Sequence, residues 1–165
     1  MSARILVVDD EADSACFIAG AIEGWGFEAV TTSNGREGLH VLHTTPIDGI
    51  FLDLEMPVMN GWTMLDELRW QGNAVPVIVM SKVFNYTTLQ RFLVEGAQDY
   101  LVKPFNHLLL MQKTFRHFPW RASVGERPAL VKDTTHEAKH SLAVGALLVQ
   151  GSFALSARKS DWKVA

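Results

Sequence analysis

The apolar residues of this chain form short continuous runs that alternate with spaced helical patterns. Such runs are typical of strands buried on both faces, and they occupy residues 4–8, 27–32, 47–52, 75–80 and 98–102. After each run, apolar residues recur at three- and four-residue spacing, which predicts a helix. These helical patterns comprise Ala15, Ile18, Ala19, Ile22 and Trp25; Leu39, Val41 and Leu42; Met64, Leu65 and Leu68; Leu89, Phe92 and Leu93; and Leu108, Leu109, Met111, Phe115 and Phe118.

The alternation of strand and helix predicts an α/β fold for residues 1–118. Parallel strands need crossover connections, and right-handed crossovers place helices on both faces of a sheet. We therefore predict a doubly wound, five-stranded parallel sheet.

Polar side chains stand where the predicted strands end. In a doubly wound sheet the carboxyl ends of the strands face one crevice, so we expect these side chains to lie near one another. They are Asp9 and Asp10 after the first strand, Asp53 after the third, Ser81 after the fourth and Lys103 after the fifth.

This set of residues has a specific chemistry, although each member alone is unremarkable as a cap or a solvated charge. Three neighbouring carboxylates repel one another unless a cation neutralises them, and oxygen ligands suit Mg²⁺. A carboxylate beside Mg²⁺ is also a nucleophile toward phosphorus. Ser81 offers a hydroxyl and Lys103 a positive charge, which are the donors that a phosphoryl group needs.

Composition changes this picture little. The chain has 165 residues, of which 48% are hydrophobic and 20% charged, so it can build a core. The net charge of −3 is too mild to indicate nucleic-acid binding, and it divides into −6 for residues 1–118 and +3 for residues 119–165. The single cysteine, Cys16, excludes an intramolecular disulfide, and its apolar setting predicts a buried thiol. With no signal pattern and no apolar run near the roughly 20 residues of a membrane span, we expect a cytoplasmic protein.

Residues 1–118 resemble a response-regulator receiver domain of two-component signalling, of the CheY-like kind. The matching features are the acidic pair Asp9-Asp10, the run Leu-Asp-Leu-Glu-Met-Pro-Val-Met-Asn-Gly around Asp53, Ser81, and Lys103-Pro104. The resemblance implies a flavodoxin-like fold with strand order 2-1-3-4-5.

The resemblance also implies roles for single residues. Asp53 would accept a phosphoryl group from a histidine kinase or phosphotransfer protein, and Ser81 and Lys103 would bind that group. Asp9, Asp10, Asp53 and the backbone carbonyl of Glu55 would hold Mg²⁺. The Lys103-Pro104 bond is commonly cis in this family.

Signalling is implied to pass through the surface of the fourth helix, fifth strand and fifth helix, with Tyr100 at the aromatic switch position. A downstream protein partner follows from this, and a homodimer is an option. The chain would be no enzyme beyond its own phosphorylation and dephosphorylation.

Three positions depart from the family pattern or occupy places that affect hydrolysis in the family. Receivers usually have a small residue after the Ser/Thr, whereas this chain has Lys82, a long cation that would either cover the site or pair with phosphate. Glu55 and Val83 occupy positions that tune hydrolysis in the family.

Residues 119–165 match no output domain, and no nucleic-acid-binding domain is evident. His136 to His140 fits the H-E-x-x-H zinc pattern, but no third ligand other than Asp161 follows. Thr134 and Glu137 also fit a capping box, which gives Glu137 a structural explanation. We predict an extension of unknown role that is partly helical or flexible.

Two other functions stay open for the domain. A binding module that switches without phosphate is the alternative that Lys82 favours. A flavodoxin-like cofactor binder would need a phosphate-binding loop after the first strand, where Asp9, Asp10 and Glu11 would repel phosphate.

Overall fold

The computed structural model describes residues 2–83, 85, 87, 91 and 94–118. The predictions made for Leu89, Phe92 and Leu93 lie outside these residues. So do the zinc-like pattern and every other prediction for residues 119–165, so the domain boundary after residue 118 remains a prediction.

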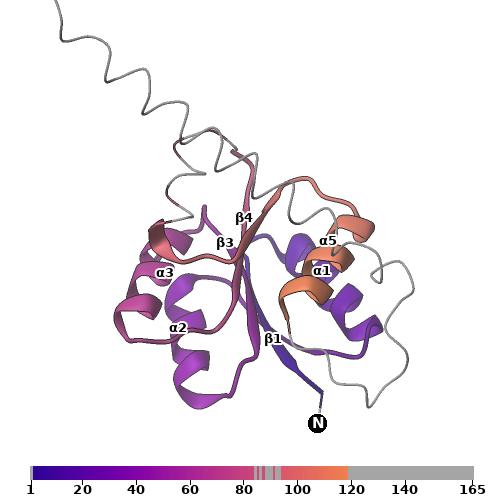
Figure 1. Ribbon diagram of the computed structural model, residues 1–165, viewed down its shortest axis with the longest axis horizontal. Helices are drawn as coiled ribbons and strands as arrows, with labels where there is room; N and C mark the ends of the chain where they lie inside the picture. The colour runs from indigo at the N-terminus through magenta and orange to yellow at the C-terminus, as the bar shows by residue number, and fades with distance from the viewer. Residues whose placement is uncertain (1, 84, 86, 88–90, 92–93, 119–165) are drawn as a thin grey trace, which may run out of the picture. The chain divides into compact units, whose positions relative to one another are not determined.

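The described residues form a five-stranded parallel sheet in the order β2-β1-β3-β4-β5 (Figure 1). The predicted fold class and strand order are confirmed. The strands are β1 (Arg4–Val8), β2 (Glu28–Thr32), β3 (Gly49–Asp53), β4 (Val77–Ser81) and β5 (Asp99–Val102). Every residue of β3 and β4 is buried, as expected for central parallel strands covered on both faces.

Helices cover both faces of the sheet. In Figure 1, α1 (Ala12–Gly24) and α5 (His107–His117) lie on one side, and α2 (Gly35–Thr44) and α3 (Gly61–Trp70) lie on the other. Three of these helices begin at an asparagine whose side chain accepts a backbone N–H of the first turn, namely Asn34, Asn60 and Asn106. In the region of the predicted fourth helix, the described residues Thr87, Arg91, Val94 and Glu95 are helical.

Strand alternation divides the core into two layers. Leu6 and Val8 of β1 pack with residues of β3, α3 and β4 on one side. On the side of α1 and α5, aromatic rings fill the space, with Phe115 5.7 Å from Phe27 and Phe51 5.0 Å from Phe118 between ring centroids. These two layers fix the strands whose carboxyl ends carry the predicted site.

The prediction that Cys16 is buried is wrong. Cys16 is exposed on α1, because the buried stripe of this helix consists of Ala15, Ile18 and Ile22. Cys16 lies one position off that stripe, which rotates its side chain about 100° around the helix axis. The neighbouring Phe17 is 46% exposed, so apolar residues on α1 extend beyond its inner face.

The inner face of α5 also differs from the predicted set. Met111 and Phe115 are buried, but Leu108 and Leu109 point outward and Leu110 and Thr114 take the inner positions. Thr114 is accommodated because its hydroxyl donates to the Leu110 carbonyl at 2.7 Å.

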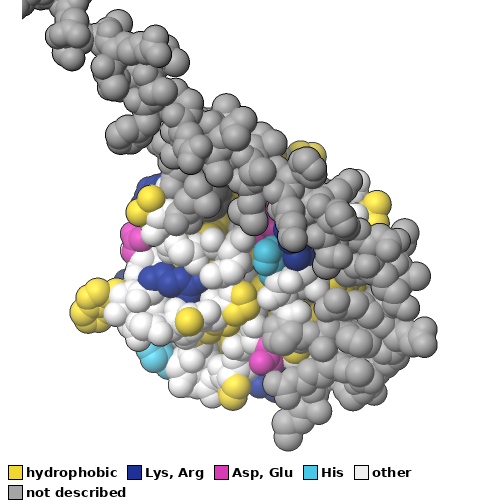
Figure 2. Space-filling view, in the orientation of Figure 1, with side chains coloured by type: hydrophobic (Ala, Val, Ile, Leu, Met, Phe, Trp, Pro, Cys, Tyr) yellow, Lys and Arg dark blue, Asp and Glu magenta, His cyan; other side chains and the backbone are white. Residues whose placement is uncertain are grey.

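On the face shown in Figure 2, exposed hydrophobic side chains occur in small separate groups.

Arg69 joins three segments at the end of the sheet where β4 and β5 begin. Its guanidinium donates to the carbonyl oxygens of Asn73 at 2.8 Å, Val75 at 3.0 Å and Gly96 at 2.8 Å. The planar guanidinium suits such a divergent set of acceptors. This end of the sheet is therefore fixed by side-chain hydrogen bonds as well as by packing.

None of the described helices combines the length and the apolar character that a membrane span requires.

Candidate functional site

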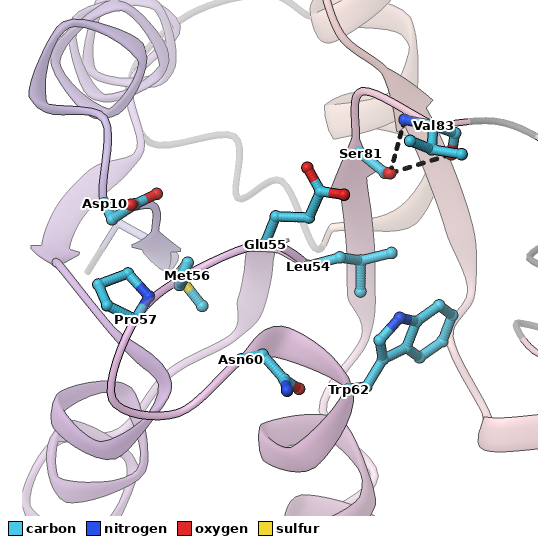
Figure 3. Close-up of a pocket in the computed structure, with 9 residues that line it drawn as sticks. All are labelled: Asp10, Leu54, Glu55, Met56, Pro57, Asn60, Trp62, Ser81 and Val83. Carbon is cyan, nitrogen blue, oxygen red and sulfur yellow. Dashed lines mark hydrogen bonds between the residues drawn. The ribbon is translucent and has the colours of Figure 1, made fainter.

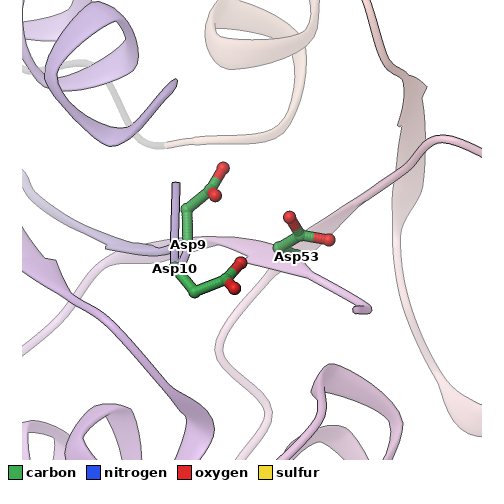
Figure 4. Close-up of side chains that lie close together, drawn as sticks. All are labelled: Asp9, Asp10 and Asp53. Atoms are coloured by element: carbon green, nitrogen blue, oxygen red, sulfur yellow. The ribbon is translucent and has the colours of Figure 1, made fainter. Parts of the chain in front are cut away.

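Three carboxylates meet at the carboxyl ends of β1 and β3. Ligand atoms of Asp9, Asp10 and Asp53 lie within 4.8 Å of one another (Figure 4), and we call these residues the acidic cluster. Asp9 and Asp53 are buried, with 2% and 4% of their surfaces exposed, whereas Asp10 is exposed. The structure thus brings together carboxylates from two strands that are far apart in the sequence.

Lys103 lies against the acidic cluster and bonds two of its members. Its ammonium donates to Asp9 Oδ2 at 2.8 Å and to Asp53 Oδ2 at 2.5 Å, and only 7% of its side chain is exposed. The Lys103-Pro104 bond is cis, as the family resemblance implied. The predicted proximity of Lys103 to Asp53 is therefore present in the structure.

In the Asp53–Lys103 pair, burial and hydrogen bonding shift the pKa of each residue in opposite directions. Burial raises the pKa of Asp53, and the bonds from Lys103 and the Glu55 N–H only partly offset it, so the pKa stays above its ordinary value. Burial alone would lower the pKa of Lys103, but its hydrogen bonds to Asp53 and Asp9 raise that pKa above its ordinary value. Lys103 therefore stays charged and remains the local counter-ion.

Two further donors position Asp9, and neither was predicted from the sequence. The Glu11 N–H donates to Asp9 Oδ1 at 3.0 Å, and the Ser14 hydroxyl donates to Asp9 Oδ2 at 2.6 Å. Ser14 belongs to the start of α1, whose first turn follows the acidic residues directly. The sequence feature that could have predicted the Ser14 contact is a hydroxyl side chain about one helical turn after an acidic pair.

An open cleft of about 630 Å³ begins at the exposed side of the acidic cluster. Figure 3 shows the Glu55 side chain directed into this cleft and Trp62 of α3 at its far end. The cleft is lined by Asp10, Leu54, Glu55, Met56, Pro57, Asn60, Trp62, Ser81 and Val83. It gives a ligand access to the side of the cluster that Asp10 occupies.

Ser81 lines the cleft, but its hydroxyl is bonded within its own turn. Ser81 Oγ donates to the Val83 carbonyl and accepts from the Val83 N–H, both at 3.0 Å (Figure 3). The hydroxyl must leave Val83 before it can donate to a group on Asp53. The structure therefore places Ser81 beside the site without engaging it.

Lys82 forms an ion pair at the edge of the site. Its ammonium lies 2.6 Å from Glu11 Oε1, and the other Glu11 carboxylate oxygen lies 3.7 Å from the Lys103 ammonium. The Glu11 hydrogen bond raises the pKa of Lys82, and that same contact lowers the pKa of Glu11. Glu11 is therefore shared between two lysines, a contact that the sequence did not predict.

The loop after β3 approaches the phosphoacceptor candidate closely. The Gly61 N–H donates to the Leu54 carbonyl at 3.1 Å, and the Glu55 N–H donates to Asp53 Oδ1 at 3.0 Å. The Asn60 cap then starts α3. Glycine is required at position 61 because the loop backbone passes directly against the carbonyl group of Asp53.

Tyr100, the predicted switch residue, lies on β5, and its ring contacts Lys113 of α5. The Lys113 ammonium is 5.3 Å from the centre of its ring and 2.5 Å from Asp99 Oδ1. Asp99 also bonds His117 Nε2 at 2.6 Å. The structure thus connects Tyr100 to α5 through Lys113.

Asp99 gives a pH-dependent contribution to stability. Burial alone would raise the pKa of Asp99, but hydrogen bonds from His117 and Lys113 lower it to about 2 from an ordinary value of 3.8. The stabilisation is therefore complete above about pH 4 and is lost as the pH falls through 2. We expect Asp99→Asn to lower the free energy of unfolding by about 2 kcal/mol at pH 6, and the difference to vanish near pH 2.

Urea unfolding of both proteins between pH 2 and pH 6 measures this difference. Asp66→Asn, an exchange at an exposed aspartate of α3, is the matched control and should change the free energy of unfolding little. A difference between Asp99→Asn and the unmodified protein that stays constant over this range would contradict the prediction.

The donor set of the acidic cluster fits a divalent cation. All its side-chain ligand atoms are carboxylate oxygens, one of its residues faces the cleft, and the Lys103 ammonium offsets only one of three negative charges. Hard oxygen ligands at an open site favour Mg²⁺ over metals that prefer nitrogen or sulfur.

Comparisons with known proteins agree with this arrangement. Residues 5–115 match the family model of the response regulator receiver domain. The chain is 40% identical over 111 residues to a probable transcriptional regulatory protein of Picosynechococcus, covering 63% of this chain and 44% of that protein. It is 30% identical over 168 residues to the regulatory protein AtoC of Escherichia coli, covering 90% of this chain and 36% of AtoC.

The chain thus spans less than half the length of these two relatives. Among solved structures, the chemotaxis protein CheY4 of Vibrio cholerae matches with a TM-score of 0.68 and 28% sequence identity, covering 72% of this chain and all of CheY4. Sequence, fold and strand order agree with the resemblance found in the motifs. The chain belongs to the family of response regulator receiver domains.

Proposed function

We propose that Asp53 accepts a phosphoryl group from the phosphohistidine of a histidine kinase or phosphotransfer protein. An Asp53 carboxylate oxygen attacks phosphorus, the phosphorus–nitrogen bond breaks, and the electron pair returns to the imidazole, which takes up a proton. The observation that carries the proposal is a buried carboxylate that ends a central strand, with a lysine ammonium on one oxygen and an open cleft beside it.

The other site residues have defined tasks in this reaction. Asp9, Asp10, Asp53 and the Glu55 carbonyl would hold Mg²⁺, which neutralises charge on the transferred group when bound. Lys103 offers an ammonium to the phosphoryl oxygens, and Ser81 offers its hydroxyl once that hydroxyl leaves Val83.

Output is proposed to follow from the movement of Ser81. The Ser81 carbonyl accepts the Lys103 N–H at 2.9 Å, so β4 and β5 are joined next to both phosphoryl-binding residues. Tyr100 and Lys113 then connect β5 to α5. A partner that binds the surface of β5 and α5 would sense the change, with a coupling free energy of about 1–3 kcal/mol.

The names of the relatives support a regulatory role. The Picosynechococcus relative is a probable transcriptional regulatory protein, and AtoC is a regulatory protein. We propose that this chain likewise acts on a downstream protein or output segment in the cytoplasm.

Phosphorylation by acetyl phosphate with Mg²⁺, followed by intact-mass measurement, tests the proposal. We expect the full chain to gain one phosphoryl group and Asp53→Asn to gain none, because an amide is a poor nucleophile. Asp66→Asn is the matched control and should gain the group as the unmodified chain does. Absence of any gain at saturating donor would refute the proposal.

A second candidate function is a protein-interaction module that works without phosphate. The Lys82–Glu11 ion pair supports it, because an exposed lysine of the chain itself already places a positive charge beside the site. Unchanged partner binding by Asp53→Asn, together with no mass gain, would favour this function.

A further inference from the structure

Lys82 has an unusual position next to the proposed phosphoryl site. It directly follows Ser81, the last residue of β4, so its backbone is fixed beside the acidic cluster. Its side chain is 59% exposed and pairs with Glu11 at 2.6 Å. The ammonium is therefore held at the edge of the site by one exposed carboxylate.

The charges at this edge are unbalanced among the described residues. The negative side chains are Asp9, Asp10, Glu11, Asp53 and Glu55, whereas Lys82 and Lys103 are the positive ones. A phosphoryl group on Asp53 replaces one carboxylate charge with up to two negative charges. The phosphorylated site therefore attracts a further cation more strongly than the free site does.

Breaking the Lys82–Glu11 ion pair costs little free energy. An ion pair between two exposed side chains contributes little to stability because water screens it. A phosphoryl dianion offers more charge and more acceptor oxygens than the Glu11 carboxylate. Lys82 is close enough to interact electrostatically with the site: Glu11 raises the pKa of Lys82 most, burial and the Lys103 charge lower it, and the Asp53 charge raises it to a smaller extent.

We propose that Lys82 is a second phosphoryl-binding cation, held by Glu11 in the free protein and transferred to a phosphoryl oxygen when Asp53 is modified. This proposal rests on the proposed function. Glu11 competes for Lys82 and keeps it from the site until a stronger anion arrives. The lysine thus discriminates the phosphorylated from the free state and adds to the donors supplied by Ser81 and Lys103.

Beryllofluoride with Mg²⁺ mimics a phosphoryl group on a carboxylate and provides a binding assay that needs no turnover. Fluorine NMR of the full chain reports the bound signal and its dissociation constant. We expect Lys82→Ala to weaken binding about tenfold through loss of one charge-assisted bond. We expect Glu11→Gln to strengthen binding about threefold, because it frees Lys82 from its competitor.

The double variant Lys82→Ala, Glu11→Gln separates this competition from other effects of Glu11. If Glu11 acts through Lys82, the double variant binds as Lys82→Ala does. Equal strengthening by Glu11→Gln with and without Lys82 would mean that Glu11 acts through Lys103, and would overturn the proposal. Lys82→Arg should retain most of the affinity because it keeps the charge.

Arg4→Gln is the matched control, because Arg4 forms an exposed ion pair with Glu28 at the other end of the sheet. It should bind beryllofluoride as the unmodified chain does. Binding by Lys82→Ala that equals or exceeds that of the unmodified chain would overturn the role of Lys82. In that case loss of binding in Asp53→Asn would still support the proposed function, whereas no binding by the unmodified chain would overturn both.

Discussion

Replacing Gly61 with alanine is expected to destabilise the domain strongly and to displace Asp53. An alanine Cβ at this position would overlap the Asp53 carbonyl oxygen and lie 2.9 Å from Leu54 Cα. Both obstacles are backbone atoms, so no side-chain rotation relieves the overlap. We expect a loss of about 3 kcal/mol in the free energy of unfolding, at the upper end for overpacked sites.

Gly20→Ala is the control, and we expect this substitution to stabilise the domain. Gly20 is an exposed residue of α1 at which an added Cβ would meet no atom within 4 Å, so alanine should stabilise the helix by about 1 kcal/mol. Urea unfolding measures both variants, and beryllofluoride binding reports whether the site has moved. Equal unfolding midpoints for Gly61→Ala and Gly20→Ala would contradict the prediction, because the loop after β3 would then move enough to accommodate the added Cβ.

Replacing Lys103 with methionine is expected to be the second most damaging change. Methionine keeps much of the apolar length of the side chain but removes the ammonium that bonds Asp9 and Asp53. Two buried carboxylates then face each other without a counter-ion, and removing one member of a buried ion pair costs about 3 kcal/mol or more. Thermal and urea unfolding in the presence of a chelator measure this loss.

Three controls identify the lost charge as the cause of the destabilisation. Adding Asp53→Asn to Lys103→Met should restore part of the lost stability, because one of the two carboxylate charges disappears. Mg²⁺ should raise the unfolding midpoint of Lys103→Met more than that of the unmodified chain, since a divalent cation can replace the missing charge. Lys82→Met, at an exposed lysine, should unfold close to the unmodified chain. An unfolding midpoint of Lys103→Met that equals that of Lys82→Met would contradict this prediction.

The sequence predicted the sheet well because central parallel strands carry a continuous apolar signal. Residues 4–8 were predicted with the observed bounds, and the other strands begin one or two positions later than predicted. Helix faces were harder to predict. Cys16 and Leu108 are apolar but exposed, because hydrophobicity alone does not determine which side of a short helix meets the sheet.

The candidate site could be predicted as a set of residues but not as a set of contacts. Strand ends placed Asp9, Asp53 and Lys103 at one edge, and the structure brings them into hydrogen-bonding distance. The Lys82–Glu11 pair joins positions 71 residues apart, and nothing in either local pattern indicated it. The hydrogen bond from the Ser81 hydroxyl to the Val83 carbonyl depends on the conformation of the backbone at Val83, and residue types alone do not determine that conformation.

The contacts of Arg69 give the domain a mechanical asymmetry. The connection from β4 to β5 is tied at Gly96 by the guanidinium, whereas its other end begins at Ser81 beside the site. A displacement that starts at Ser81 therefore begins at the carboxyl end of β4, whereas Arg69 holds the backbone that precedes β4 at Val75 and β5 at Gly96. We expect the carboxyl end of β4, beside Asp53, to move more on phosphorylation than the backbone at Val75 and Gly96.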